Sequence, residues 1–437
     1  MQNIENVKYD KSFIIYLSSS VLLFSFLYIF IVFESINKYN SINFLLYIIS
    51  LIVVVFSIYS IKKKNINSYN IFLLFYFFAL FLNTINLSSK QFLKTPEDLY
   101  YFLLSPFIVV IFLYISENIQ VEKLSLKNVV KFNVNSVYVV LLTSYILLKL
   151  YIGMKMGFRI MDYSDISRIV SGSDYVIPGI SGISVILQWT LVILIPYVKK
   201  RYSILAIISI IILSGILNVK RGDIIRLLIF LLIYYTFIKI QLHQLTSKKI
   251  IHLFVYISIF IAIFIVFGQY RMEARGGTDS IIIEYLGSRI DTPSVAWLYS
   301  YFAFNFEILK LNYAIPASYS FIHLNEIFGA SLSRETLGLE TTISGFNAST
   351  FIGPYVLDFG RFFFFELFFF SVLISLLILI IRKIDFLGLY IFIAMLMSLM
   401  IFGDYLVNRA MIMSIIFALI LFPFLKFKNE LSIRKAK

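Results

Sequence analysis

Long apolar runs recur along the chain, separated by short polar connections. Each run has about 17 to 25 residues, enough for a helix to cross a hydrocarbon core of ~30 Å. The runs are apolar on every face, whereas membrane barrel strands have about 10 residues and alternate in polarity. Lipid admits only helices or closed barrels as spanning structures, because the spanning backbone must satisfy its own hydrogen bonds. The pattern therefore predicts an all-α, polytopic membrane protein of about twelve transmembrane helices, at 13–33, 43–61, 69–87, 100–116, 134–152, 180–198, 203–219, 224–240, 250–267, 356–381, 386–402 and 411–427.

Positive charge alternates between the connections. Every second connection is basic, and so is the C-terminal tail. Cytoplasmic connections carry an excess of Lys and Arg, so this alternation predicts that both termini are cytoplasmic. The basic residues that carry the pattern are Lys62, Lys63, Lys64, Lys123, Lys127, Lys131, Lys199, Lys200, Arg201, Lys248, Lys249, Arg382, Lys383, Lys426, Lys428, Arg434, Lys435 and Lys437.

Two connections that should lie outside are nevertheless basic. The segment 153–179 carries Arg168, and the tight turn at 220–223 carries Lys220 and Arg221. One interpretation is that the rule is statistical and that nearby aspartates offset these charges. The other is that outward-facing cations bind an anion. The sequence leaves both interpretations open.

The chain is expected to form a single integral membrane domain, 1–437, with extracytoplasmic loops at 153–179 and 268–355. The larger loop is rich in aromatic and aliphatic residues, so we expect helices that cap the bundle rather than a disordered linker. Thr292 followed by Pro293 predicts the start of an amphipathic helix through Trp297, Tyr301 and Phe304. Further helices are expected at 280–289 and 318–328.

Composition supports a membrane protein and excludes several classes of chemistry. The chain is 60% hydrophobic, carries a net charge of +14 and has no cysteine. The positive charge is typical of a protein near anionic head groups, and nucleic-acid binding is not expected. The absence of cysteine excludes disulfides and thiol catalysis. The few histidines show no metal-ligand spacing and no Walker A motif is present, so neither a metal nor a cofactor is expected.

Arginines gather in the large outer loop and at its end. A guanidinium is permanently charged and binds phosphate oxygens in a bidentate way, so this set suits a lipid-linked phosphate or pyrophosphate. Snorkelling to lipid head groups is the alternative for any single arginine. Among the outer acids, Asp358 at the membrane boundary is the candidate general base, and Glu366 is an acid within the tenth predicted span. The arginines are Arg271, Arg275, Arg289, Arg334 and Arg361.

In these features the chain resembles the Wzy-type O-antigen polymerases. The residues that carry the resemblance are Gly345-Phe346-Asn347-Ala348-Ser349-Thr350, then Gly353-Pro354 and Leu357-Asp358-Phe359-Gly360. The family pattern is also matched by two short motifs, Lys220-Arg221-Gly222-Asp223 and Tyr270-Arg271. In addition, Arg168 and Gly179 have the same spacing as Arg334 and Gly345. Arg361 followed by a run of phenylalanines departs from the family pattern.

The resemblance implies a glycosyltransferase that joins undecaprenyl-pyrophosphate-linked oligosaccharide repeat units into surface polysaccharide, without a metal, at the outer face of the bacterial plasma membrane. A chain-length regulator and a flippase are the expected protein partners. Under this reading Arg271 and Asp358 are the candidate catalytic residues. The candidate substrate-binding residues are Arg221, Arg275, Arg289, Arg168, Arg334, Asn347 and His323.

Rival functions remain open. A flippase for the same lipid-linked unit would have a similar number of spans, but it needs charges deep in the membrane rather than a large outer loop. An O-antigen ligase shares the architecture and differs in its acceptor. A transporter of other solutes would be expected to show repeated halves with broken helices, and no such repeat is found.

Overall fold

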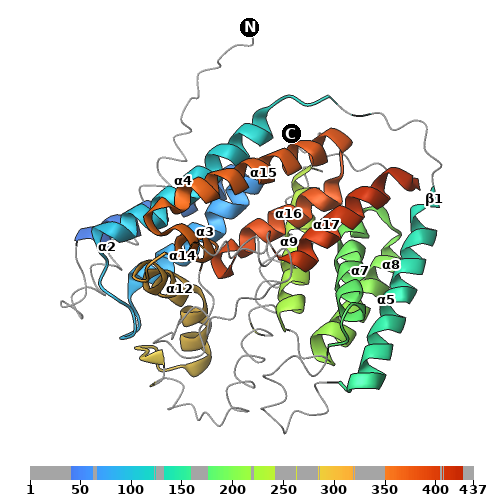
Figure 1. Cartoon of the computed structure of the whole chain (residues 1–437), viewed down its shortest axis with the longest axis horizontal. Helices are drawn as coiled ribbons and strands as arrows, with labels where there is room; N and C mark the ends of the chain where they lie inside the picture. Colours follow the sequence, from blue (N-terminus) through green and yellow to red (C-terminus); the bar gives the residue numbers. More distant parts are fainter. Residues whose placement is uncertain are drawn as a thin grey trace.

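A computed structural model describes residues 41–62, 66–122, 124, 132–158, 176–217, 221–241, 262, 284, 286–317, 319, 350–403, 406 and 408–426; at 62, 221 and 239–241 it describes the backbone alone. This part of the chain is almost entirely helical (Figure 1). Its elements are α2 (Ser41–Lys62), α3 (Ser68–Ile85), α4 (Pro96–Asn118), β1 (Phe132–Asn133), α5 (Val134–Met156), α7 (Ile180–Leu194), η3 (Ile195–Tyr197), α8 (Lys200–Ile210), η4 (Ile211–Ile216), α9 (Arg221–Gln241), α12 (Pro293–Tyr313), α14 (Gly353–Phe359), η5 (Gly360–Phe362), α15 (Phe363–Ile384), α16 (Leu387–Ser398), η6 (Leu399–Phe402), α17 (Arg409–Leu421), η7 (Phe422–Phe424) and β2 (Leu425–Lys426).

Within the described residues, 6 helical segments are long and apolar enough to cross a membrane. The all-α membrane class is therefore confirmed for this part of the chain. The helices α8, α9, α16 and α17 coincide with further predicted spans, whereas 13–33 and 250–267 lie outside the description. A total of about twelve spans stays a prediction. The segments are Ser41–Ile61, Ser68–Ile85, Pro96–Asn118, Val134–Met156, Ile180–Tyr197 and Gly353–Ile384.

The outward surface of these helices is apolar. Phe107 of α4, Leu147 of α5 and Phe365 of α15 are 61%, 61% and 64% exposed. A soluble protein rarely exposes apolar side chains of this size on successive helices. The same surface is stable when the surrounding solvent is lipid, which agrees with the apolar runs of the sequence.

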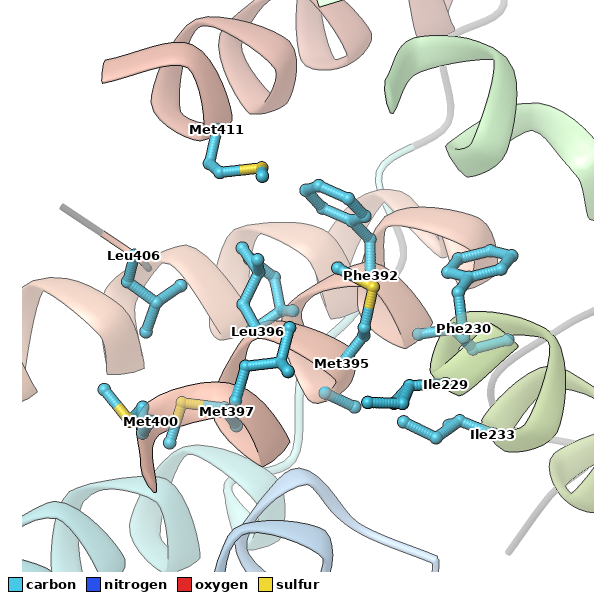
Figure 2. Packing of buried hydrophobic residues seen from close by; sticks show 14 of the residues in the cluster. Ile229, Phe230, Ile233, Phe392, Met395, Leu396, Met397, Met400, Leu406 and Met411 are labelled. Atoms are coloured by element: carbon cyan, nitrogen blue, oxygen red, sulfur yellow. The ribbon is translucent and has the colours of Figure 1, made fainter. Parts of the chain in front are cut away.

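Helix α16 lies at the centre of the fold (Figure 1), and all its residues are buried. It packs against α3 and α15 on one side and against α7 and α9 on the other. Figure 2 shows Phe392, Met395 and Leu396 of this helix among side chains of α9 and α17. Since no face of α16 meets solvent, its sequence is apolar all round, as expected for a fully buried helix.

Several basic connections lie together at one end of the bundle. The backbone N–H of Leu124 donates to the carbonyl of Lys383 at 3.0 Å, and that of Lys199 donates to the Asn135 side chain at 2.9 Å. At the same end β1 pairs in parallel with β2, which places Asn133 beside Lys426. Connections that the positive-inside rule assigned to one side of the membrane are thus neighbours in space.

The opposite end carries the described parts of the predicted large loop. The connection from α3 to α4 pairs with the segment before α12, where Ser89 N–H donates to the Gly287 carbonyl at 2.7 Å. The N–H of Phe351 donates to the carbonyl of Met400 at the end of the α16 segment, also at 2.7 Å. The described portion of this loop is therefore packed onto the bundle.

The structure differs from the sequence prediction at three places in this region. The predicted amphipathic helix exists as α12, with Thr292 at its N-cap and Pro293 at its first position, but it is buried on nearly every side. The predicted helix at 280–289 does not reach its end, because Gly287 takes a left-handed φ of 55°. The tenth span is interrupted at Gly360, as described below. The stretch 318–328 lies outside the described residues except for position 319.

Candidate functional site

Only part of the predicted site can be placed. Asp358 is fully buried, Arg289 is exposed, and Arg221 is the first residue of α9, where the backbone alone is described. The remaining predicted site residues lie outside the described residues; they are Arg168, Arg271, Arg275, His323, Arg334 and Asn347. The structure therefore neither assembles nor separates the predicted arginine set.

Asp358 occupies the last turn of α14, a short helix that begins with Gly353-Pro354 and packs against α12 and α15. Its side chain is 0% exposed, and its backbone carbonyl accepts from the N–H of Tyr319 at 3.0 Å. Burying a carboxylate is costly unless it is hydrogen-bonded or paired. The Asp358 carboxyl group is therefore part of the packed interior and is not a solvated surface charge.

The helix break after Asp358 is built by Gly360. Its φ of 54° lies in the left-handed region, which glycine adopts without steric cost. The chain then forms the short turn η5, so that α14 and α15 are separate helices within the apolar segment Gly353–Ile384. Arg361 in this turn is exposed and pairs at 3.0 Å with the exposed Glu97. Such a solvent-screened pair contributes little to stability.

A buried ion pair fixes α12 to the connection between α3 and α4. The Lys94 ammonium lies 2.5 Å from Glu307, and both side chains are 0% exposed. The Glu307 carboxylate also accepts from the Asn83 amide at 2.6 Å and from the Phe92 N–H at 3.0 Å. The carboxylate is thus well satisfied, which a buried charge requires.

A second polar contact lies farther along α12. Lys310 pairs with the buried Asp98 at 2.8 Å, and the Tyr313 hydroxyl donates to the same carboxylate. Burial and then the nearby Asp98 carboxylate raise the pKa of Tyr313, so this hydroxyl stays protonated. Asp98 also caps α4 by accepting from the Thr95 N–H at 2.6 Å. We call these residues the α12 cluster: Asn83, Lys94, Asp98, Glu307, Lys310 and Tyr313.

A second group of polar residues surrounds the first turns of α9. The Ser214 hydroxyl donates to Asp223 at 2.5 Å, and Arg226 pairs with the other oxygen of that carboxylate at 3.1 Å. Ser214 belongs to η4, a π-helical turn of Ile211–Ile216. Such turns are rare and are frequent at functional sites. The π-helical turn places the Ser214 hydroxyl within hydrogen-bond distance of Asp223 in the next helix, α9.

Helices α5 and α7 complete this group. The guanidinium of Arg226 lies 5.9 Å from the ring centroid of Trp189, and Lys149 lies 5.8 Å from that of Tyr145. The Tyr145 hydroxyl reaches the carbonyl oxygen of Gln188 at 3.5 Å. We call these residues the α9 cluster: Tyr145, Lys149, Gln188, Trp189, Ser214, Asp223 and Arg226. Trp189, Gln188 and Tyr145 are 0% exposed.

The two clusters are linked through apolar packing. Ile225 of α9 packs against the hydrophobic group formed by the first turns of α12, which includes Trp297 and Phe304. The start of α9, which carries Arg221, therefore adjoins the helix that the α12 cluster holds in place. Among the described residues, no group of His, Cys, Asp and Glu is arranged to bind a metal ion.

Among the basic and amide residues of these clusters, five were not predicted from the sequence: Asn83, Lys94, Lys149, Gln188 and Lys310. A usable signal existed for Lys149, which is a lone charge in the apolar run 134–152. A charge in a spanning helix usually faces the bundle interior, and Lys149 is indeed only 5% exposed. Lys94 gave no such signal, because it lies in a connection where a lysine is ordinarily solvated.

The chain was also compared with known proteins. No protein-family model, no curated protein and no solved structure matches it. The functional argument therefore depends on the residues and their placement.

Proposed function

We propose that this protein is a membrane glycosyltransferase that polymerises lipid-linked oligosaccharide repeat units at the outer face of the bacterial plasma membrane. Two features support this proposal independently of the family resemblance. The chain forms a bundle of apolar helices, and its basic connections meet at one end, which the positive-inside rule assigns to the cytoplasm. The end that carries Asp358, α12 and the start of α9 is then the outer one.

The buried carboxylate of Asp358 is the observation on which the proposal chiefly depends. It lies at a helix break on the outer end, beside α12, in the segment whose sequence resembles the polymerases. An acid held away from water is suited to take a proton from a sugar hydroxyl, provided that the substrate brings the hydroxyl within hydrogen-bond reach.

The proposed reaction replaces the bond between the anomeric carbon and pyrophosphate with a glycosidic bond between two sugars. The hydroxyl oxygen of the incoming unit attacks the anomeric carbon of the growing chain, and the bond from that carbon to the pyrophosphate breaks. Asp358 takes the hydroxyl proton, and the lipid pyrophosphate leaves with the bonding electron pair. Arg221, Arg271, Arg275 and Arg289 are proposed to stabilise the charge that develops on the pyrophosphate.

A flippase for the same lipid-linked unit is the second candidate, and the α9 cluster is the observation that favours it. Lys149, Asp223 and Arg226 are charged groups within the helical bundle, where charges commonly mark a transport path. A transporter would use them to carry the pyrophosphate head group between leaflets.

Deletion of the gene in its source organism, followed by size separation of the surface polysaccharide, distinguishes the candidates. Loss of the polymer ladder with a single repeat unit still exported supports the polymerase. Loss of all external material with repeat units trapped inside supports the flippase. Retained polymer that stays on its lipid carrier supports a ligase. An unchanged ladder contradicts all of them. Inserted Arg221→Ala and Arg271→Ala proteins that polymerise fully would disprove the arginine assignments.

A further inference from the structure

The α9 cluster contains buried hydrogen-bond donors that are not satisfied. The indole Nε1 of Trp189 and the amide Nε2 of Gln188 are buried and make no hydrogen bond within the described structure. Both residues are 0% exposed. Native proteins leave few buried N–H groups without a partner, and each such group calls for an explanation such as a bound water or ion. Gln188 and Trp189 are adjacent in α7, so both unsatisfied groups lie at the same level of the bundle.

Both side chains contact other residues of the α9 cluster. The Trp189 ring lies beneath the Arg226 guanidinium, and the Gln188 amide contacts the Tyr145 hydroxyl through its oxygen. Lys149 lies beside the Tyr145 ring, one turn farther along α5. Trp189 thus lies against one cationic side chain, and Gln188 contacts the tyrosine that lies beside the other.

The chemistry of this constellation selects one class of ligand. An indole N–H donates only, and Lys and Arg side chains also have no acceptor. Lys149 and Arg226 give the cluster two positive charges against the single carboxylate of Asp223, and a neutral sugar hydroxyl would leave this excess unbalanced. A cation would be repelled by Lys149 and Arg226. An oxyanion accepts from every one of these groups and gains from the charge-assisted hydrogen bonds.

Asp223 has a positioning role in this arrangement. Its carboxylate holds Arg226 at 3.1 Å and is itself held by Ser214 of the π-helical turn at 2.5 Å. The guanidinium is therefore fixed above Trp189 before a ligand enters. Such preorganisation lowers the entropy lost on binding.

We propose that the α5–α7–α9 interface contains an oxyanion subsite formed by Lys149, Gln188, Trp189 and Arg226, which takes a phosphate-sized group. The site does not depend on the polymerase reaction, because a flippase would use it equally well. The anion can be a lipid head group or a soluble phosphate, since both present the same acceptor oxygens.

The fluorescence of Trp189 provides a direct test. The chain has only 2 tryptophans, so Trp297→Phe leaves Trp189 as the sole tryptophan, which is excited selectively over the tyrosines at long wavelength. The purified full chain in maltoside detergent micelles, which contain no phosphate, is titrated with inorganic phosphate and with pyrophosphate, and a second preparation is held in phosphatidylglycerol nanodiscs without soluble anion. A saturable change in emission with the soluble anions indicates a free-anion site. A change only in the phosphatidylglycerol discs indicates a head-group site.

Substitutions then connect the binding to the proposed residues. Arg226→Gln is expected to weaken the apparent affinity by about tenfold or more, because it removes a charge-assisted hydrogen bond. Arg201→Gln is the matched control, since Arg201 also lies over an aromatic ring, at 4.7 Å from that of Tyr202, but at the basic end. Trp189→Phe, followed by calorimetry, keeps the aromatic packing and removes only the N–H, and it should also weaken binding.

Two results would overturn the proposal. The first is the absence of any anion-dependent change in both preparations. The second is a folded Arg226→Gln or Trp189→Phe protein that binds the anion as tightly as the parent chain. Neither result bears on the polymer ladder, so this inference and the polymerase proposal can fail separately.

Discussion

The Lys94 ammonium and the Glu307 carboxylate form an ion pair at 2.5 Å with no exposure of either side chain. The pair joins two segments that are 213 residues apart in sequence. It fixes α12 against the outer ends of α3 and α4, together with the contact between Lys310 and Asp98. The described part of the predicted outer loop therefore belongs to the rigid bundle.

Removing one partner of this pair is expected to destabilise the protein strongly. Glu307→Gln leaves the Lys94 ammonium buried without its counter-ion, and such changes cost about 3–5 kcal/mol. Denaturant unfolding of the purified protein in detergent, followed by Trp297 emission, measures the loss. Glu97→Gln breaks the exposed pair with Arg361 and should cost less than about 1 kcal/mol. Equal losses for the two variants would contradict the proposed role of the buried pair.

Close packing of α16 on α7 depends on Gly388. A Cβ at this position would lie 1.9 Å from the carbonyl oxygen of Ile193. Gly388→Ala should therefore force the helices apart and destabilise the bundle by roughly 1–3 kcal/mol or more. Gly182→Ala is the control, because nothing lies within 4 Å of the added carbon. Thermal unfolding in detergent compares them, and an unchanged Gly388→Ala midpoint would refute the close approach.

Single cysteines can test which end of the bundle faces outward, since the natural chain has none. Leu93→Cys lies in the exposed connection before α4 and should react with a membrane-impermeant maleimide in intact cells. Lys200→Cys lies at the basic end and should react only after the cells are permeabilised. The reverse pattern would invert the topology and place Asp358 on the cytoplasmic side.

Asp358→Asn tests the proposed general base. The amide is nearly isosteric but cannot accept the hydroxyl proton, so polymerisation should slow by on the order of 10²- to 10⁴-fold. Complementation of the deletion strain, with the polymer ladder separated on a gel, measures the effect after membrane insertion has been verified. Glu97→Gln changes an exposed acid at the same end and should leave the ladder intact. A full ladder with Asp358→Asn would remove this residue from the mechanism.

The helices of the bundle could be predicted from the sequence because the signal is local. The runs 43–61 and 134–152 are continuous and apolar, and the structure forms α2 and α5 over them with ends that differ by a few residues. The break in the tenth span could not be predicted in the same way. The phenylalanines after Arg361 extend the apolar run, and only the backbone conformation of Gly360 separates α14 from α15.

The burial of α12 was also hidden from the sequence. Along the chain, Glu307 and Lys310 have the pattern of solvated charges, and together they indicate a helix on a surface. Their partners Lys94 and Asp98 lie more than two hundred residues away, at separations of 213 and 212. A pairing of this kind depends on the tertiary fold, which periodicity does not encode.

Reconstitution of the purified chain tests the central claim most directly. The protein is placed in liposomes with lipid-linked repeat units isolated from its source, without nucleotide sugars or added metal, and the products are separated by size. The polymerase proposal predicts a ladder of lipid-linked oligomers, with lipid pyrophosphate released as the ladder grows. Repeat units that remain single, in the presence of folded and correctly inserted protein, would contradict it.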